Sequence, residues 1–388
     1  MRTLVLGGYG NFGARIARAL AHDTCFELLI AGRDVAGGRA FAARLGHGAQ
    51  AVALDLSAPD FAQQLRQLGV QLVIHTAGPF QRQDYGVAQA AAAAGAHYID
   101  LADGRRFVCD FAPALDAAFR AADRCAVSGA STVPALSSAV VDHLCAGWQA
   151  IDRIDTCIAP AQNAPRGRAT LAAVLDYCGA PIQVWRAGQW QALQGWAAPT
   201  RVRFARLAPR RGALCDIPDL ELFPAHYRVR QEVMFRAALE VGFTQTVFAL
   251  LARLRAWGVL RRPAALAGLL HQLAPAADFL GSRLGGMVLR VEGRDAQGQA
   301  ARRAWHLAAD HDHGPEIPCM AAILLTRRLA RGGEVPRGAS ACVGLLTLRD
   351  FEPEFARWGM VTDEHDETDT YLEPDSRGYR GAARQRAA

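Results

Sequence analysis

Short apolar runs alternate with amphipathic segments along the first part of the chain. Continuous apolar runs predict buried strands at residues 3–6, 26–31, 51–54, 71–75, 97–101 and 125–128. Between them, apolar residues spaced three or four apart predict helices, as in residues 14–20 and 35–45. Strands that alternate with helices are typical of a doubly wound parallel sheet. We therefore expect an α/β domain of Rossmann type over residues 1–149.

The hydrophobic pattern changes near residue 150. Residues 150–312 contain short segments of strand character, separated by Gly, Pro and polar residues, which indicates an inserted α+β domain built on a mixed sheet. Residues 313–361 are expected to return to the first domain, with 342–348 pairing at a sheet edge. Residues 362–388 are polar with few apolar positions and predict a disordered tail.

A glycine-rich segment joins the first predicted strand to the first helix. Gly8 allows a tight turn, Gly10 lets a pyrophosphate approach the backbone, and Gly13 lets the helix pack close to the strand. The helix N-terminus then offers unpaired N–H groups to phosphates. The segment predicts a dinucleotide site whose contacts are Gly8, Tyr9, Gly10, Asn11, Phe12 and Gly13.

The end of the second predicted strand indicates which dinucleotide is bound. An Asp or Glu there holds the ribose hydroxyls of NAD, whereas an Arg accommodates the 2′-phosphate of NADP. This chain has Arg33, followed by Asp34. We expect NADP, and Asp34 is the residue that would support NAD instead. Asp55, after the third strand, either lies near the adenine or caps the next helix.

The loops after the fourth and fifth strands supply the remaining candidates. They lie at the carboxyl edge of the sheet, where open α/β folds bind ligands. Hydride transfer needs a group that exchanges a proton, and we consider His75 and Asp103 for this role. The alternatives are a core histidine and a turn residue. The residues expected to line the cofactor here are Ala77, Gly78, Pro79 and Phe80.

Composition limits the function classes. The chain has 388 residues and a net charge of +6 without a dense run of like charges, which does not favour nucleic acid as a partner. Nine Cys without a CxxC pair favour free thiols in a reducing compartment, so we expect a cytoplasmic protein. We expect no signal peptide, because the first predicted strand already begins at Thr3. Residues 310–313 (DHDH) lack spaced partners, and we expect no metal site. The sequence contains no run of 18 uncharged apolar residues, so we expect no transmembrane helix.

The chain contains no Lys, so all 43 of its basic residues are Arg. A lysine Schiff base and a lysine general base are therefore excluded. Proton transfer falls to His, Asp, Glu, Tyr, Cys or water.

Together these motifs resemble the saccharopine dehydrogenase-like family of NADP-binding oxidoreductases. The resemblance lies in residues 7–13, 31–33, 77–80, 98–101, 314–318 and 345–351. It implies a Rossmann domain, an inserted mixed-sheet domain and a C-terminal helix that returns to the first domain. It also implies hydride transfer to or from a small-molecule substrate, which the motifs do not identify. Some members use a Lys, which this chain lacks.

Two other functions remain open. In an enoyl or other lipid-precursor reductase, the predicted helices of residues 244–284 would line an apolar pocket. Their apolar residues with flanking Arg could also lie on a membrane surface, although such a stripe is more often core or a subunit contact. The second alternative is a non-catalytic NADP-binding sensor or scaffold, because no catalytic dyad is evident. A homodimer is a further expectation.

Overall fold

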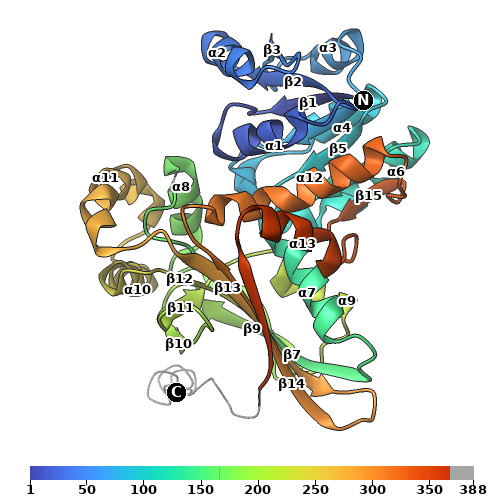
Figure 1. Cartoon of the computed structure of the whole chain (residues 1–388). Coiled ribbons are helices and arrows are strands. Elements are labelled where there is room, and N and C mark those ends of the chain that lie inside the picture. The colour runs from blue at the N-terminus through green and yellow to red at the C-terminus, as the bar shows by residue number, and fades with distance from the viewer. Residues whose placement is uncertain (166, 368–388) are drawn as a thin grey trace, which may run out of the picture. The chain divides into compact units, whose positions relative to one another are not determined.

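The computed structural model describes residues 1–165 and 167–367, and it forms two compact units (Figure 1). Unit 1 comprises Met1–His143, Ile217–Leu222 and Pro315–Trp358. Unit 2 comprises Leu144–Asp216, Phe223–Gly314 and the chain from Gly359 onward. The short segment 217–222 thus belongs to the first unit, although the expected boundaries gave all of 150–312 to the second.

Unit 1 is a doubly wound α/β domain. Its described residues form a seven-stranded sheet in the order β15-β6-β5-β4-β1-β2-β3, with every neighbouring pair parallel. The expected Rossmann-type fold is therefore confirmed. The strands are β1 (Arg2–Leu6), β2 (Glu27–Gly32), β3 (Gln50–Ala53), β4 (Leu72–His75), β5 (His97–Asp100), β6 (Cys125–Ser128) and β15 (Gly338–Ala341).

Several helices of unit 1 pack against this sheet, among them α1, α2, α4 and α6. In α1, Ile16 and Leu20 lie four apart on one face, and both are fully buried. Figure 1 shows α12, from the C-terminal part of the chain, beside α1. The helices are α1 (Asn11–Ala21), α2 (Val35–Leu45), α3 (Phe61–Gln67), α4 (Gly86–Ala93), α5 (Arg105–Cys109), α6 (Phe111–Ala121), α7 (Ser137–Leu144), α12 (Ile317–Ala330) and α13 (Leu348–Arg357).

The edge strand of this sheet is not the one expected. Residues 338–341 pair with β6, whereas 342–347 form the loop that leads into α13. Thr347 starts that helix through a capping box with Asp350, in which each side chain bonds the other residue's backbone N–H. Cys342, Leu346 and Leu348 are buried although they lie in this loop and at the start of the helix, outside any strand.

Unit 2 is built on a mixed sheet, as expected. Its described residues form nine strands, in which β12 and β7 pair parallel and the other pairs are antiparallel. The path runs β10-β11-β12-β7-β13-β14-β16; outside it, β8 pairs with β12 and β9 pairs with β8. The strands are β7 (Ala150–Ala159), β8 (Pro181–Arg186), β9 (Gln189–Gln194), β10 (Thr200–Val202), β11 (Arg210–Leu214), β12 (Glu232–Ala238), β13 (Gly285–Arg294), β14 (Ala300–Ala309) and β16 (Val361–Asp366).

Four helices complete the described chain: α8 (Arg168–Tyr177), α9 (Asp219–His226), α10 (Gly242–Ala256) and α11 (Ala267–Leu273). The helical region predicted over 264–284 is broken into 3₁₀ turns on either side of α11. Among residues 1–165 and 167–367, no helix is long and apolar enough to cross a bilayer.

The expectation of a disordered tail from residue 362 is wrong at its beginning. Val361–Asp366 forms β16, which pairs with β14. Arg206 binds the Asp363 carboxylate through Nε and Nη2 at 2.7 and 2.8 Å, and Arg290 bonds Glu367 at 2.9 Å. These ion pairs hold a polar strand that has little apolar surface of its own. Residues 368–388 lie outside the described part.

Candidate cofactor and catalytic site

The glycine-rich segment makes a tight turn between β1 and α1. Gly7 has a φ of +73°, which favours glycine, and its N–H and that of Gly8 both donate to the carbonyl of Ala31 at the end of β2. The Gly10 N–H donates to the Gly7 carbonyl at 2.8 Å. Gly10 is also the N-cap of α1 and provides no side chain to its first N–H groups. The turn therefore presents a helix N-terminus with unpaired donors.

The three motif glycines differ in what surrounds them. A Cβ on Gly13 would lie 2.2 Å from the Gly7 carbonyl oxygen and 2.7 Å from Thr76 Oγ1. A Cβ on Gly8 would lie 2.8 Å from the Val5 carbonyl oxygen. Among the described residues other than those next to it in the chain, a Cβ on Gly10 would have one atom within 4 Å, the Gly7 carbonyl oxygen at 3.0 Å. Packing thus requires Gly8 and Gly13, whereas Gly10 leaves open space beside the N-terminus of α1. Such a cradle fits a pyrophosphate.

Tyr9 connects this turn to the end of β2. Its hydroxyl accepts the backbone N–H of Asp34 at 2.8 Å, and its ring lies over Gly32, where a Cβ would approach the hydroxyl to 2.3 Å. The Asp34 carboxylate accepts the N–H of Gly37 at 3.0 Å and is the N-cap of α2. Arg33, between these residues, has an exposed side chain.

Asp55 closes a local turn. Its Oδ1 accepts the backbone N–H and the hydroxyl of Ser57 at 3.0 and 2.7 Å. These hydrogen bonds lower the pKa of the Asp55 carboxyl, and the positive charge of Arg33 adds to the effect. Helix α3 begins only at Phe61 with Asp60 as its N-cap, so of the two interpretations the helix cap is wrong, and the Asp55 carboxylate bonds only within its own turn in the hydrogen bonds above. The interpretation as an adenine neighbour stays a prediction.

The remaining residues of the phosphate turn are held by other parts of unit 1. Asn11 Oδ1 accepts from Arg15 at 2.7 Å, and the Phe12 carbonyl accepts the Cys319 thiol at 3.6 Å. These contacts fix the first turn of α1. Neither residue was expected to make them.

The loop after β4 is fixed by one side chain. Gln83 Nε2 donates to the carbonyls of Ala77 and Pro79 at 2.7 and 3.0 Å. Gly78 and Pro79 are exposed, whereas Phe80 is buried, with its ring 5.0 Å from that of His75. The Phe80 ring therefore holds the loop to the core beside His75. Because it is buried, it does not line a cofactor in this conformation, unlike the expectation for Phe80.

His75 belongs to a buried polar network. Its Nδ1 lies 3.0 Å from the Tyr98 hydroxyl, and burial lowers the pKa of His75 to about 4. Its partner in register on β5 is Asp100, which is also buried. Burial raises the pKa of Asp100 to about 6, against the opposing effect of hydrogen bonds to the carboxylate. Those bonds come from Ala102 N, Ser128 Oγ and Gly129 N at 2.9, 3.0 and 2.8 Å.

This arrangement favours the alternative interpretation of His75 as a core histidine, neutral at pH 7. Sequence reasoning missed the network around it, although a signal was present. Tyr98 and Asp100 lie two apart at the end of a buried strand, and side chains two apart share one face.

Asp103 lies on the surface, beside the loop after β4. Its side chain is exposed, and Oδ1 accepts from Gln81 Nε2 at 3.0 Å. The two loops approach closely, since a Cβ on Gly104 would lie 3.3 Å from the Gln81 backbone. The structure thus brings Asp103 together with the loop that carries Gly78 and Pro79.

A second buried carboxylate reaches unit 1 from segment 217–222. Asp219 Oδ2 accepts the Ser137 hydroxyl at 2.6 Å, and burial raises the pKa of Asp219 to about 7. Glu221 accepts from Arg105 Nε at 2.8 Å. These contacts explain why the segment joins unit 1, which its position in the sequence did not indicate.

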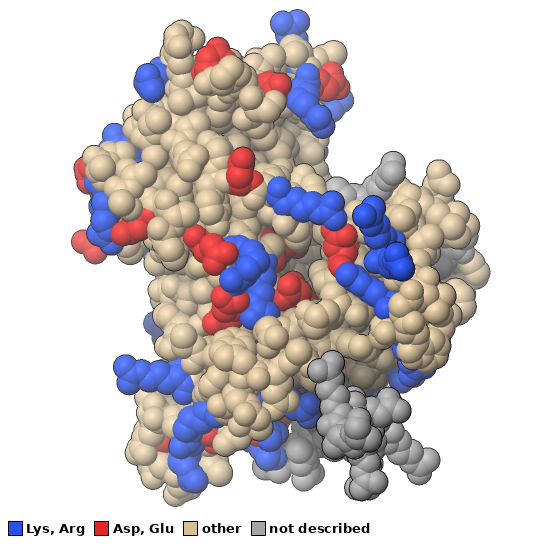
Figure 2. Space-filling model, turned by 180° about the vertical axis from the view of Figure 1, so that it is seen from behind, with Lys and Arg blue, Asp and Glu red and all other residues tan. Residues whose placement is uncertain are grey.

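Basic and acidic side chains are interspersed on the surface of the molecule that Figure 2 shows. They lie next to one another there, in keeping with ion pairs such as Arg230–Asp152 at 2.7 Å. No group of three or more His, Cys, Asp and Glu in the described residues is arranged to hold a metal ion.

The chain is similar to known proteins in sequence over its first part and in fold over most of its length. Residues 3–133 match the sequence family described as the saccharopine dehydrogenase NADP binding domain. Among solved structures, the apo saccharopine dehydrogenase (L-Glu forming) of Saccharomyces cerevisiae aligns over 94% of this chain and 99% of its own, with 12% identity and a TM-score of 0.69. A probable dehydrogenase from Thermotoga maritima aligns over 94% and 98%, with 8% identity and a TM-score of 0.47. None of the curated protein sequences matches the chain.

Proposed function

We infer the action of the site from one premise: residues 3–133 are a saccharopine dehydrogenase NADP binding domain, and the protein is an NADP-dependent oxidoreductase. The expected family resemblance is thereby confirmed. NADPH, when bound, supplies a hydride. The chain's own residues must bind it, orient a substrate beside it and exchange a proton.

We propose that the turn of Gly8, Gly10 and Gly13 holds the pyrophosphate and that Arg33 binds the 2′-phosphate. The observation that carries this proposal is that the Asp34 carboxylate already caps α2 by accepting the Gly37 N–H. Binding of the ribose hydroxyls to Asp34 would therefore compete with the cap. Arg33 is exposed beside it, and a guanidinium meets a phosphate with paired, charge-assisted hydrogen bonds.

We further propose that a small-molecule substrate binds near Gly78 and Pro79, with Asp103 as the group that holds a substrate amine or exchanges the proton. Asp103 is exposed and held by Gln81 next to that loop. His75 then acts as a positioning residue, since its buried ring packs under the loop against Phe80.

The experiment combines NADPH with panels of imines, keto acids and enoyl thioesters, followed by the absorbance of the reduced cofactor. On the active panel, Asp103→Asn should lower kcat roughly 10²–10⁴-fold and leave NADPH affinity unchanged. Asp84→Asn is the matched control, because Asp84 is also exposed and hydrogen-bonded in the neighbouring loop. Equal kcat for Asp103→Asn and wild type would remove Asp103 from the reaction.

The same panels separate the alternatives. Turnover of enoyl thioesters alone would favour the lipid-precursor reductase, which the exposed apolar side chains of residues 243–280 support. NADPH binding without turnover on any panel would favour the sensor or scaffold.

We also propose a cytoplasmic location and a homodimer. The location is supported by the nine cysteines, all of which are free thiols. Light scattering of the purified protein measures the oligomeric state, and a monomeric mass would contradict the homodimer.

A further inference from the structure

Residues 242–281 of unit 2, called here the 242–281 segment, carry most of the large apolar side chains exposed in the described residues. Eight of the ten lie there: Phe243, Leu250, Trp257, Val259, Leu269, Leu273, Phe279 and Leu280. The exposed fractions of Phe243, Trp257 and Phe279 are 75%, 71% and 83%. Gathered apolar side chains of this size on a protein surface mark a site of interaction.

The inner face of α10 already has its partners in unit 2. Phe248 is buried with its ring 4.7 Å from that of Trp196. Ala252 lies so close to the neighbouring turn that a Cβ on Gly179 would approach its carbonyl oxygen to 2.5 Å. This face of α10 therefore packs against the rest of unit 2.

The outer face of α10 carries larger apolar residues than the inner face. Phe243, Leu250 and Trp257 are seven residues apart, which puts them on one stripe of a helix. That stripe lies about 180° around the axis from Ala252. A helix that only packs on its own domain shows the reverse order, with polar residues outward.

The charge of the segment is strongly positive. Residues 242–281 contain four Arg and a single acid, Asp278. Asp278 accepts a hydrogen bond from Gln162, and Arg255 donates to backbone carbonyls of residues 176 and 178. The other three Arg of the segment have exposed side chains: Arg253, Arg261 and Arg262.

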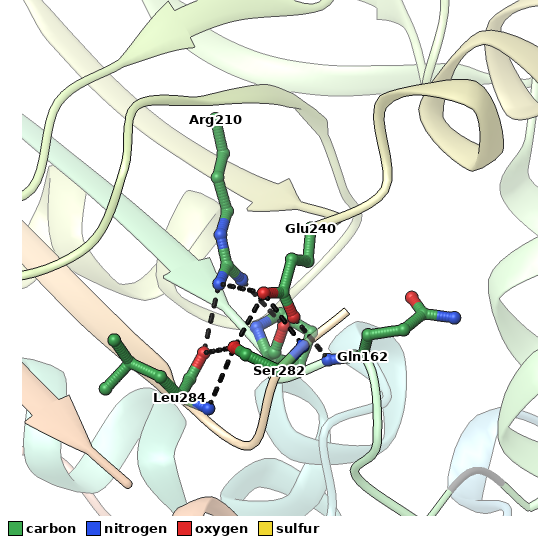
Figure 3. Close-up of polar contacts among 6 residues, drawn as sticks. Gln162, Arg210, Glu240, Ser282 and Leu284 are labelled. Carbon is green, nitrogen blue, oxygen red and sulfur yellow. Dashed lines mark hydrogen bonds and ion pairs between the residues drawn. The ribbon is translucent and has the colours of Figure 1, made fainter. Parts of the chain in front are cut away.

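The two ends of the segment are tied together at its base (Figure 3). Glu240, just before α10, accepts the backbone N–H and the hydroxyl of Ser282 at 3.1 and 2.6 Å, and the N–H of Gln162 at 2.8 Å. Arg210 lies 3.5 Å from the same carboxylate and donates to the carbonyls of Pro160 and Leu284. These hydrogen bonds fix the base of the segment, whereas eight of its large apolar side chains are exposed.

We propose that the 242–281 segment docks unit 2 on a membrane surface that contains anionic lipid. The apolar side chains enter the boundary between headgroups and acyl chains, and Arg253, Arg261 and Arg262 contact lipid phosphates. Charge complementarity selects this occupant. A two-fold contact with a second copy would bring two like-charged segments together, whereas an anionic bilayer attracts the Arg through its headgroups and takes up the apolar side chains at its acyl boundary.

The test measures co-sedimentation of the full chain with vesicles of phosphatidylcholine, with and without phosphatidylglycerol. The wild type should bind only the anionic vesicles. Phe243→Ser combined with Trp257→Ser should lower this partitioning at least about tenfold. Arg261→Glu combined with Arg262→Glu should do the same, because attraction becomes repulsion.

The matched control is Trp190→Ser, which removes an exposed Trp from the hairpin of β8 and β9 outside the segment. It should leave partitioning unchanged, and NADPH affinity should be that of wild type in all variants. Failure of the wild type to bind anionic vesicles would overturn the proposal. So would a dimer in light scattering that Phe243→Ser with Trp257→Ser dissociates, because a second copy would then cover the segment.

Discussion

Replacing Arg33 with Ala should remove most of the preference for NADPH over NADH. Arg33 follows the end of β2 directly, its side chain is exposed, and the neighbouring carboxylate of Asp34 is engaged in capping α2. The Arg33 guanidinium is therefore available to bind the 2′-phosphate of NADPH, a group that NADH lacks.

The magnitude follows from the kind of contact. Hydrogen bonds to a charged partner contribute about 1.5–3 kcal/mol. That range corresponds to roughly a ten- to hundredfold change in the dissociation constant of NADPH. The affinity for NADH should stay nearly unchanged. Rising salt should reduce the preference of the wild type, because the contact is electrostatic and the site is exposed.

Calorimetric titration of both cofactors into wild type and Arg33→Ala measures the effect. Arg39→Ala is the matched control, since Arg39 is an exposed Arg on α2 and its loss changes the net charge equally. A wild type that prefers NADH would refute the reasoning. An equal loss of both cofactors in Arg33→Ala, or an equal loss of NADPH in Arg39→Ala, would do so too.

Three further predictions concern stability and binding. Gly13→Ala should lower the free energy of unfolding by about 1–3 kcal/mol, whereas Gly10→Ala should weaken NADPH binding more than it lowers stability. Scanning calorimetry measures stability and titration calorimetry measures NADPH affinity; equal losses of stability in the two variants would contradict the different roles of Gly10 and Gly13. As pH falls from about 6 to 3.8, the free energy of unfolding of the wild type should rise relative to that of Asp100→Asn by about 1.4 kcal/mol per pH unit, because the folded state binds the Asp100 proton more tightly than the unfolded state. Chemical denaturation over this pH range measures it, and an equal pH dependence in both proteins would contradict the raised pKa of Asp100. Deletion of 362–388 should lower Tm by about 5 °C or more, since it removes β16 and takes the Glu367 carboxylate away from the buried Arg290 guanidinium. Deletion of 368–388, which keeps β16, is the comparison, and an unchanged Tm after deletion of 362–388 would contradict a stabilising role for β16.

Local patterns in the chain were sufficient to predict the cofactor domain. Buried parallel strands need continuous apolar runs, and residues 3–6 and 125–128 have them. The turn between β1 and α1 leaves no room for side chains at Gly8 and Gly13. The apolar runs and the tight glycine turn each involve residues close together in the sequence, so both can be predicted from the amino-acid sequence alone. The same holds for the position of Arg33 at the end of β2.

Only the tertiary structure decided what the polar side chains do. His75 and Asp103 looked alike as candidates, yet one lies in the core against Tyr98 and the other on the surface beside Gln81. Asp219 joined the first unit through Ser137, a partner 82 positions away. Hydrogen bonds of this kind depend on which elements meet in space and on how much water is excluded there. No local pattern of apolar and polar residues carries that information, because the partners are distant in the chain and the same carboxylate caps, binds or stays buried according to its neighbours.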